Sequence, residues 1–204
     1  SVTRARTAIE NESLASEIAP IEIKGAIVKD DEQPGKAKID KIPNLRPAFK
    51  ADGTITAANA SSISDGASAL VLTREGKLAG RVPLARIVEH ATHSIHPSEF
   101  TLAPIGAIEK LLAKTGWDLD SVDLFEINEA FAMVTMLTTQ SLGLDPSKVN
   151  VFGGACAQGH PIGSTGSRLI VTLAHAMKNQ GKKRGIAALC IGGGEATAVA
   201  LERI

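Results

Sequence analysis

From residue 82 onward, short apolar runs alternate with helix-length segments, and this alternation constrains the fold more than any other sequence feature. Strands are predicted at residues 82–89, 122–127, 149–152, 185–191 and 196–202, and helices at residues 104–115, 130–142 and 164–180. Helical crossovers of this length join parallel strands, so we expect a mostly parallel sheet with helices on both faces. Only glycines and Glu195 separate the last two strands, which predicts an antiparallel hairpin at the edge of a five-stranded, mixed α/β sheet.

The first 79 residues are less regular. We predict a helix at 1–19, a strand at 20–28, a turn at 30–35, a loop at 36–56 and a buried strand at 67–73. Helical spacing starts at Ser1 without a capping residue ahead of it, so we expect that an upstream stretch is missing. The change of pattern places a domain boundary between residues 79 and 80.

The composition argues against several classes of function. Basic and acidic side chains balance at 22 each and aromatic residues make up 3%, so we expect no nucleic-acid partner. No apolar run is long enough to cross a membrane and none is typical of a secretion signal. Two cysteines do not form a disulfide framework, which favours a reducing compartment and a cytoplasmic location.

Three polar groups follow three different predicted strands. Asn128 follows 122–127, His160 lies in the glycine-rich turn after 149–152, and Cys190 lies near the end of 185–191. Ligand sites of such sheets lie beyond the carboxyl ends of the strands, so we expect the three groups to converge. An amide, an imidazole and a thiol together suit acyl-thioester chemistry.

Each candidate has a chemical rationale and a structural alternative. The imidazole of His160, beside a helix start, can take a thiol proton or donate to a carbonyl. The glycines after Cys190 offer backbone N–H groups to a developing oxyanion, although a lone cysteine is commonly inert packing. Asn128 can hold a water beside an enolate oxygen or merely cap a helix, and Glu129 is interpreted as structural.

Two further groups are interpreted as structural. Cys156 lies among small apolar residues, which favours packing over nucleophilic chemistry. His90, His93 and His96 recur every third residue. That spacing alternates faces in a strand and drifts in a helix, so we predict no metal site.

Five motifs carry a resemblance that covers nearly the whole chain. The strings are RPAF, NASSISDGA, NEAFA, GGACAQGHPIGSTG and CIGGG. They resemble the C-terminal half of thiolases, the acetyl-CoA acetyltransferases. The resemblance implies a thiolase-like layered fold whose N-terminal half is missing. Residues 1–79 then correspond to the remnant of a loop domain and the last strand of that half, and 80–204 to the C-terminal domain.

The resemblance also implies roles for individual residues. The acyl group is carried by a cysteine of the N-terminal half, which His160 activates. Cys190 moves the proton at the α-carbon, and Asn128 holds a water in the enolate oxyanion hole. The N–H of Gly192 serves the second oxyanion hole. The substrates are coenzyme A thioesters, no cofactor is bound covalently, and the intact enzyme is a homodimer or homotetramer.

Contacts with coenzyme A and the acyl path are implied for Phe49, Ala57, Ser61, Ala130 and Phe131. The chain departs from the usual family pattern at Cys156 and Gln158, where larger apolar residues are typical. Residues 100–104 also depart from it, in a segment that lies near the acyl pocket of the family. These departures leave the preferred acyl chain length open.

Three alternatives stay open at this point. A ketoacyl synthase relative would share the sheet, but it normally has histidine or asparagine at the position of Cys190. A non-catalytic half-domain could bind coenzyme A or a protein partner. A hydrolase could use Cys156 with His160. We favour a thiolase that catalyses reversible Claisen condensation of acyl-CoA, and we expect this chain alone to be inactive and to expose an apolar face.

Overall fold

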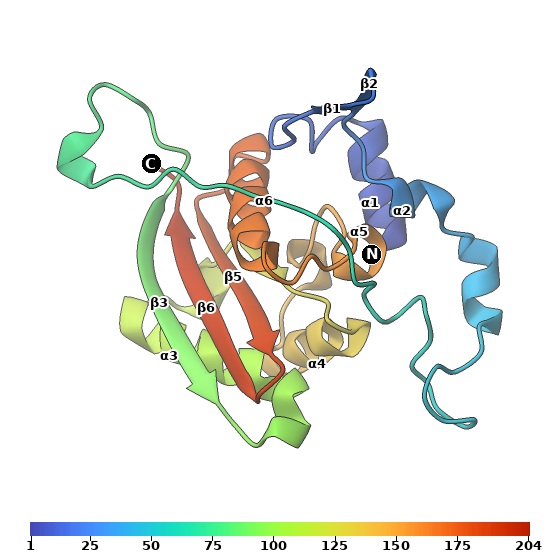
Figure 1. Cartoon of the computed structure of the whole chain (residues 1–204). Helices are drawn as coiled ribbons and strands as arrows, with labels where there is room; N and C mark the ends of the chain where they lie inside the picture. The colour runs from blue at the N-terminus through green and yellow to red at the C-terminus, as the bar shows by residue number, and fades with distance from the viewer.

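A four-stranded mixed sheet forms the centre of the computed structural model, which describes residues 1–204 (Figure 1). Its strands are β3 (Arg86–Ser94), β4 (Leu124–Ile127), β5 (Arg184–Ile191) and β6 (Glu195–Glu202). Their order is β3-β6-β5-β4, and only β4 and β5 are parallel. The prediction of a mostly parallel sheet is therefore wrong, whereas the mixed sheet and the antiparallel β5–β6 hairpin are confirmed.

The β5–β6 hairpin lies in the middle of the sheet rather than at its edge. β3 pairs with β6 along almost its whole length, from Arg86 opposite Glu202 to Ser94 opposite Glu195. This pairing covers the edge that the hairpin would otherwise expose, and it extends β3 beyond the predicted end at residue 89.

The predicted strand at residues 149–152 does not form, so the sheet has four strands rather than five. Val149 makes a single parallel bridge to Phe125. At the next position, Asn150 adopts a left-handed backbone conformation with φ of 47°. This conformation turns the chain away from the sheet before a ladder can develop.

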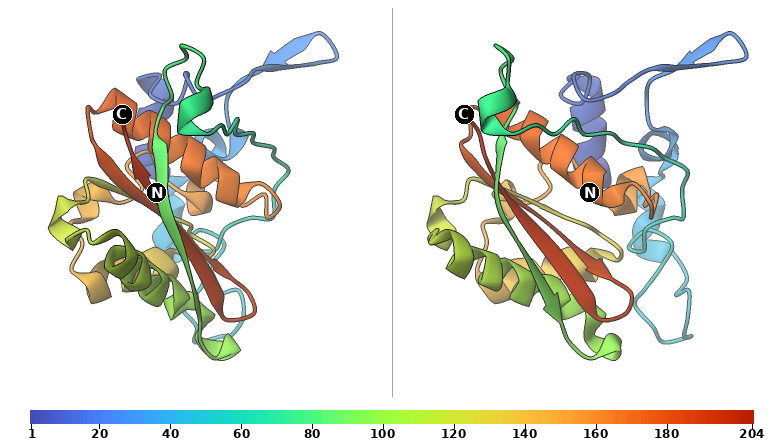
Figure 2. Two further views of the ribbon diagram at one scale, coloured as in Figure 1. Left: turned by 90° about the vertical axis from the view of Figure 1, so that its left-hand side faces the viewer. Right: turned by 60° about the vertical axis from the view of Figure 1, so that its left-hand side comes forward.

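Helices cover both faces of the sheet, as the sequence predicts (Figure 2). On one face α3 (Ala103–Thr115) and α4 (Ala132–Leu142) pack around Ile108, Leu111 and Phe125. On the other face α6 (Thr165–Asn179) and α1 (Val2–Glu10) enclose a second core that includes Leu173. Each fully buried leucine or isoleucine contributes roughly 1.5–3 kcal/mol, so the two cores hold the strand ends in place.

Glycines end the helices close to the predicted positions. α3 stops at Gly116 and α4 at Gly143, both with positive φ angles of 66° and 64°. A residue without a Cβ adopts this left-handed conformation at little cost. α6 begins one residue later and ends one residue earlier than predicted.

The helix and strand of the N-terminal region are shorter than the sequence predicts. α1 ends at Glu10 rather than at residue 19, and turns follow it. The predicted strand at 20–28 is instead a hairpin of β1 (Ile21–Ile23) and β2 (Ala26–Val28). Lys24 and Gly25 both take positive φ angles, which forms the tight turn between them.

Short helical segments replace some of the predicted turns and loops. α2 (Glu32–Lys36) forms where a turn is predicted, and α5 (Ala155–Gln158) precedes the turn that contains His160. Single turns of 3₁₀ helix occur at Ile39–Asn44, Glu75–Lys77, Pro97–Leu102, Leu119–Ser121 and Pro146–Lys148.

Residues 67–73 do not form the predicted buried strand. No strand lies beside them, and Val71 and Leu72 are 95% and 69% exposed. In Figure 1 this segment crosses over α6 as an extended chain, which a hydrogen bond of 2.9 Å from Ser68 Oγ to the Ser164 carbonyl attaches to the helix start. An apolar run without a pairing strand cannot satisfy its backbone groups in a sheet. The boundary at residues 79/80 stays a prediction.

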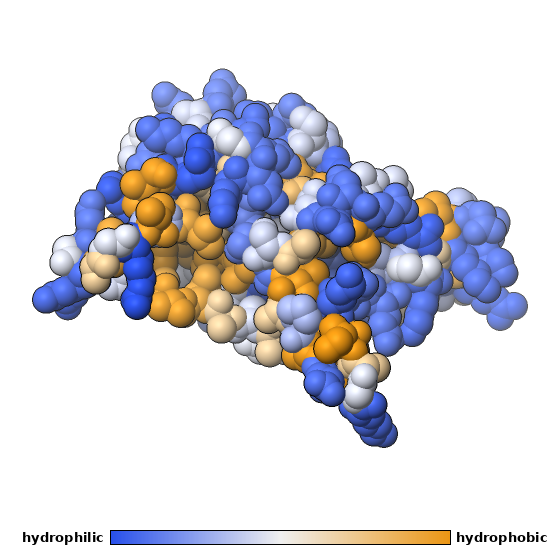
Figure 3. Space-filling model, turned by 90° about the horizontal axis from the view of Figure 1, so that it is seen from above, coloured by the Kyte–Doolittle hydropathy of each residue, from blue (hydrophilic) through white to orange (hydrophobic).

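Large apolar side chains are exposed, and they gather beside the C-terminus. Val71, Leu72, Pro83, Ile87 and Ile204 line a groove between the extended segment and β3. Figure 3 shows the apolar hollow from above, at the left. Exposure of this kind agrees with the apolar face that we expect from the sequence. None of the helices has the length and apolarity needed to cross a membrane.

Candidate active site

The end of β4 delivers Asn128 to the site in a fixed position. The Asn128 backbone N–H donates to the Ala188 carbonyl of β5 at 2.9 Å. One residue earlier, the Asn150 side chain accepts from the Ile127 N–H and donates to the Ile127 carbonyl, both at 2.8 Å. Asn128 is also fully buried, so packing restricts both its backbone and its side chain.

The turn between α5 and α6 positions His160. Its backbone N–H donates to the Ser62 carbonyl at 3.0 Å, which ties the turn to the N-terminal region. Its Nδ1 lies 2.7 Å from Thr165 Oγ1 in the first turn of α6. One contact therefore holds the backbone of His160 and the other holds its imidazole.

Thr165 also determines which imidazole nitrogen carries the proton. Its hydroxyl donates to the Pro161 carbonyl at 2.9 Å, so the Thr165 oxygen accepts from His160 Nδ1–H. Nε2 then keeps its lone pair in the neutral ring. Burial lowers the pKa of His160, and the nearby Arg168 cation lowers it further. The ring is thus suited to accept a proton through Nε2.

Asn128 and His160 meet, as the sequence predicts. The Asn128 Nδ2 amide lies 3.4 Å from His160 Nε2. Asn128 Oδ1 is buried and receives no hydrogen bond from the protein. Since a buried amide oxygen without a donor is unfavourable, this atom is a ready acceptor for an O–H group bound beside the imidazole.

Cys190 lies near the end of β5 and makes no side-chain hydrogen bond to Asn128 or His160. Its side chain is buried, and burial raises the pKa of the thiol. The group is therefore a neutral thiol at rest and a strong base once it is deprotonated. The convergence of all three groups is confirmed only for the Asn128–His160 pair.

The glycines after Cys190 differ in what they require. Gly194 has φ of 92°, and a Cβ there would collide with the Ile95 carbonyl oxygen. Gly192 is exposed, a Cβ there would meet nothing, and its N–H donates to no protein acceptor. Gly194 shapes the turn, while the Gly192 N–H is available to an external oxygen.

Residues implied in coenzyme A contacts fall into two groups. The Ser61 N–H and hydroxyl both donate to the Ala130 carbonyl, at 3.1 and 2.9 Å, and Phe131 bridges to Ala60. The pairing keeps Ala130 and Phe131 extended, so α4 begins at Ala132 rather than at residue 130. Ala57 is exposed on the same loop, and Phe49 is 73% exposed on a preceding loop.

Glu129 makes the contacts of a structural residue. Its Oε2 accepts from the Cys156 N–H at 3.0 Å and from the Ser1 hydroxyl at 2.8 Å. Burial and this carboxylate raise the pKa of Cys156 to about 12. A thiol with so high a pKa is a poor nucleophile, which favours the packing interpretation and disfavours a Cys156–His160 hydrolase.

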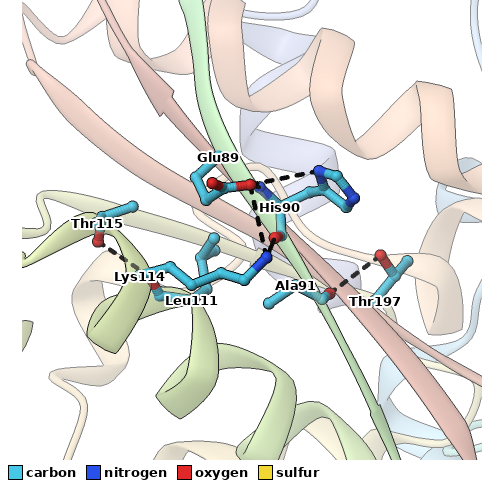
Figure 4. A network of polar contacts seen from close by, with 7 residues as sticks. All are labelled: Glu89, His90, Ala91, Leu111, Lys114, Thr115 and Thr197. Carbon is cyan, nitrogen blue, oxygen red and sulfur yellow. Dashed lines mark hydrogen bonds and ion pairs between the residues drawn. The ribbon is translucent and has the colours of Figure 1, made fainter.

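The three closely spaced histidines do not share a site. Figure 4 shows His90 beside Glu89, whose carboxylate also lies 3.7 Å from the Lys114 ammonium group. His93 packs against Gly106 of α3, and His96 accepts from the Ser98 N–H at the start of a 3₁₀ turn. No group of three or more histidine, cysteine, aspartate or glutamate side chains is arranged to hold a metal ion.

Two positioning residues have no distinctive sequence signal. Asn150 looks like part of a strand, and Thr165 like an ordinary residue of a helix start. The left-handed backbone of Asn150 and the short contact of Thr165 with the imidazole arise only when β4, α5 and α6 pack together.

Comparison with known families matches both parts of the chain. The family described as "Thiolase, C-terminal domain" matches residues 81–203, and "Thiolase, N-terminal domain" matches residues 1–76. The first match alone covers more than half of the chain, and it confirms the resemblance seen in the motifs.

Individual relatives agree with the family match. The chain is 47% identical to a probable acetyl-CoA acetyltransferase of Dictyostelium discoideum, over 100% of this chain and 51% of that protein. It is 48% identical to a cytosolic acetyl-CoA acetyltransferase of Mus musculus, over 86% of this chain and 46% of that protein. The chain therefore spans about half the length of the curated relatives it matches.

A solved structure supports the same fold. The Bacillus anthracis acetyl-CoA acetyltransferase superposes with a TM-score of 0.96 at 42% identity, over 100% of this chain and 54% of that one. At this similarity the layered arrangement of the sheet and helices is the same, even though the sheet has one strand fewer than predicted.

Proposed function

Because the chain belongs to the thiolase family, we propose that it forms the proton-transfer half of an acyl-CoA C-acyltransferase. The reaction is the reversible Claisen condensation of two acyl-CoA thioesters, with thiolysis of a 3-ketoacyl-CoA such as acetoacetyl-CoA as its reverse. The observation that carries the proposal is the Asn128–His160 pair, in which Thr165 accepts from His160 Nδ1–H and the Nε2 lone pair faces the Asn128 amide.

The first half-reaction needs a nucleophilic thiol. In the proposal His160 Nε2 accepts the proton of that thiol, and the thiolate adds to the acyl carbonyl carbon. The C–S bond to coenzyme A then breaks, and the leaving coenzyme A thiolate takes the proton of the Cys190 thiol, which leaves Cys190 as a thiolate. Both cysteines of this chain have raised thiol pKa values. We therefore assign the acyl-carrying thiol to a segment outside these 204 residues.

The second half-reaction needs a base and support for an enolate. Cys190, as a thiolate, removes the α-proton of the second thioester, and the resulting carbanion attacks the acyl carbonyl carbon. The C–S bond to the acyl-carrying thiol then breaks, and the released thiolate takes its proton back from the His160 imidazolium. Asn128 and His160 stabilise the enolate oxygen, with Asn128 acting through a water held by its amide. The unbonded Gly192 N–H stabilises the oxyanion on the acyl group.

Coenzyme A contacts are proposed along the loop that meets the start of α4. Ser61, Ala130 and Phe131 lie where the loop is hydrogen-bonded to the start of α4, and Ala57 and Phe49 are exposed to solvent. The substrates are coenzyme A thioesters, and the mechanism uses no covalently bound cofactor. A cytoplasmic location and assembly into a homodimer or homotetramer with the N-terminal half belong to the same proposal. Similarity to a cytosolic relative supports the location.

The test is thiolysis of acetoacetyl-CoA by free coenzyme A, followed by loss of the magnesium-enolate absorbance. The 204-residue chain is compared with a version that also carries the N-terminal half of a thiolase. Activity is expected only in the longer protein, and a His160→Asn variant of it should lose most of that activity.

Two results would reject the proposal. Thiolysis by the 204-residue chain alone would mean that Cys156 or Cys190 is the nucleophile. Binding of coenzyme A by the longer protein without thiolysis would instead favour a non-catalytic binding half-domain.

A further inference from the structure

Leu124, Glu126 and Asn128 lie along β4 and just after it, on the face that α6 covers. Residues alternate between the two faces of a strand. Phe125 and Ile127 belong to the core on the α3 side, whereas Leu124 belongs to the core on the α6 side. Glu126 therefore lies on the α6 face, one step below Asn128. It is 1% exposed, and neither of its carboxyl oxygens has a hydrogen-bond partner.

Arg168 is the buried cation that α6 contributes on the side of Thr165. It follows Thr165 by one helical turn, so the two side chains lie on the same side of the helix. Arg168 Nε and Nη2 are buried without a partner, and Nη1 makes only a long contact of 3.5 Å to Gln158 Oε1. Gln158 is one of the polar departures from the family pattern, and it lies two residues before His160.

A second carboxyl group approaches the same interface from the segment after α1. Glu17 Oε1 accepts from the Thr172 hydroxyl of α6 at 2.8 Å, and its Oε2 is buried without a partner. Arg168, Glu126 and Glu17 are thus three ionisable side chains with buried, unpartnered atoms where α6 packs against β4 and the segment after α1. Burying ionisable groups without hydrogen-bond partners carries a desolvation penalty.

The charges of the cluster do not cancel at neutral pH. Burial raises the pKa of Glu126 to about 8 and that of Glu17 to about 7, even though Arg168 opposes both shifts. A guanidinium group stays charged in proteins. After burial, the Arg168 charge is the second cause of the lowered pKa of His160.

Other charged groups also face the cluster. Glu129 and Arg4 act on Glu126, and Asp31 acts on Glu17 and is itself influenced by Arg168. Arg168 is the only one of these groups that acts on Glu126, Glu17 and His160 alike.

We propose that Arg168, enclosed with Glu126 and Glu17, is a positioning residue that keeps the His160 imidazole neutral and aligned with Asn128. Arg168 lies on α6 one turn after Thr165, which binds His160 Nδ1, and its Nη1 reaches Gln158, two residues before His160. Its role in catalysis rests on the proposed function, because a neutral imidazole matters only if Nε2 accepts a proton there. Its effect on the imidazole does not depend on any substrate.

The test is an NMR titration of the histidine ring protons in the 204-residue chain, which contains five histidines. A His160→Asn variant assigns the His160 signal. In Arg168→Met the His160 titration midpoint should move to higher pH, because a cation that disfavours the imidazolium has been removed. Arg168→Lys keeps the charge and should hold the midpoint near that of the unchanged chain.

Two further variants separate positioning from folding. Arg184→Met removes a half-buried arginine at the opposite end of the sheet and should leave the His160 midpoint unchanged. If Arg168→Met alone does not fold, the Glu126→Gln/Arg168→Met double variant carries the test, because it leaves no buried ionisable group at position 126. The same upward shift is expected in it.

An unchanged or lowered His160 midpoint in a folded Arg168→Met or double variant would overturn the proposal and leave Arg168 a purely structural residue. The result is independent of the thiolysis assay. A shifted midpoint with no thiolysis in the longer protein would retain the positioning role and reject the proposed function. Thiolysis in the longer protein with an unshifted His160 midpoint would retain the proposed function and reject the positioning role of Arg168.

Discussion

Two apolar runs of similar composition differ in structure: one is a buried strand and the other is an exposed, extended segment. Residues 185–191 form β5, which is hydrogen-bonded on both edges and largely buried. Residues 67–73 have the same apolar character but lie extended and mostly exposed, because no strand flanks them. The difference shows that apolar character alone does not form a strand. A strand also requires neighbours that satisfy its backbone and cover its side chains.

The largest expected difference between the two regions is in side-chain packing. Leu111→Ala removes a fully buried side chain from the α3 core and should lower the free energy of unfolding by about 3 kcal/mol. Leu72→Ala makes the same chemical change at a 69% exposed position and should change it by less than about 0.5 kcal/mol. Urea denaturation measures both, and equal losses would show that residues 67–73 are packed in solution.

A second comparison concerns glycines with positive φ angles. Gly194 has φ of 92° and is crowded by the Ile95 carbonyl, whereas Gly25 in the β1–β2 turn has φ of 81° and open surroundings. Gly25→Ala should cost only the left-handed strain of about 1–2 kcal/mol. Gly194→Ala should cost more, because the backbone must also move. Thermal denaturation of the two variants would contradict this account if the order were reversed.

A third prediction concerns pH. The raised pKa of about 8 means that folded Glu126 keeps its proton between roughly its ordinary value of 4.5 and pH 8, where the unfolded chain has lost it. The folded state binds more protons in this window, so stability should fall as pH rises through it, by at most about 1.4 kcal/mol per pH unit.

Glu126→Gln is the variant that checks the pH prediction. It cannot titrate, so the decline in unfolding free energy between pH 5 and pH 8 should become shallower. Glu17 supplies a smaller decline that remains, since its pKa is about 7. An unaltered pH slope in Glu126→Gln would mean that the Glu126 carboxyl group is not protonated in the folded chain.

The smallest expected effect is at the contact between the loop that carries Ser61 and the segment before α4. Ser61→Ala removes the hydroxyl bond to the Ala130 carbonyl but leaves the backbone N–H bond to the same oxygen. The loss of stability should stay below about 1 kcal/mol. Hydrogen exchange at the backbone amide of residue 61 would measure the residual contact, and a large rise in exchange in the variant would show that the hydroxyl holds the two segments together.

Much of the C-terminal region is predictable because its signals are local. Apolar periodicity locates α3, α4 and α6, and Gly116 and Gly143 end two of these helices as expected. The glycine-rich connection predicts the antiparallel β5–β6 pair. The motifs around Asn128, His160 and Cys190 indicate the family and the chemistry, and the family matches confirm the first of these.

Other features depend on contacts between distant residues, which no local pattern contains. The pairing of β3 with β6 moves the hairpin to the centre of the sheet, and the left-handed Asn150 ends the predicted strand at residue 149. The tautomer of His160 depends on Thr165 and Pro161, whose positions are set by the start of α6.

The sequence by itself determined the helices, the tight turns and the reactive groups, because each of these depends on neighbouring residues and on side-chain chemistry. Only the tertiary structure decided which strands pair, which apolar runs are buried, and that Glu126 and Arg168 have buried polar atoms without partners. These outcomes depend on burial and on long-range partners, and burial is what shifts the pKa values of the groups at this site.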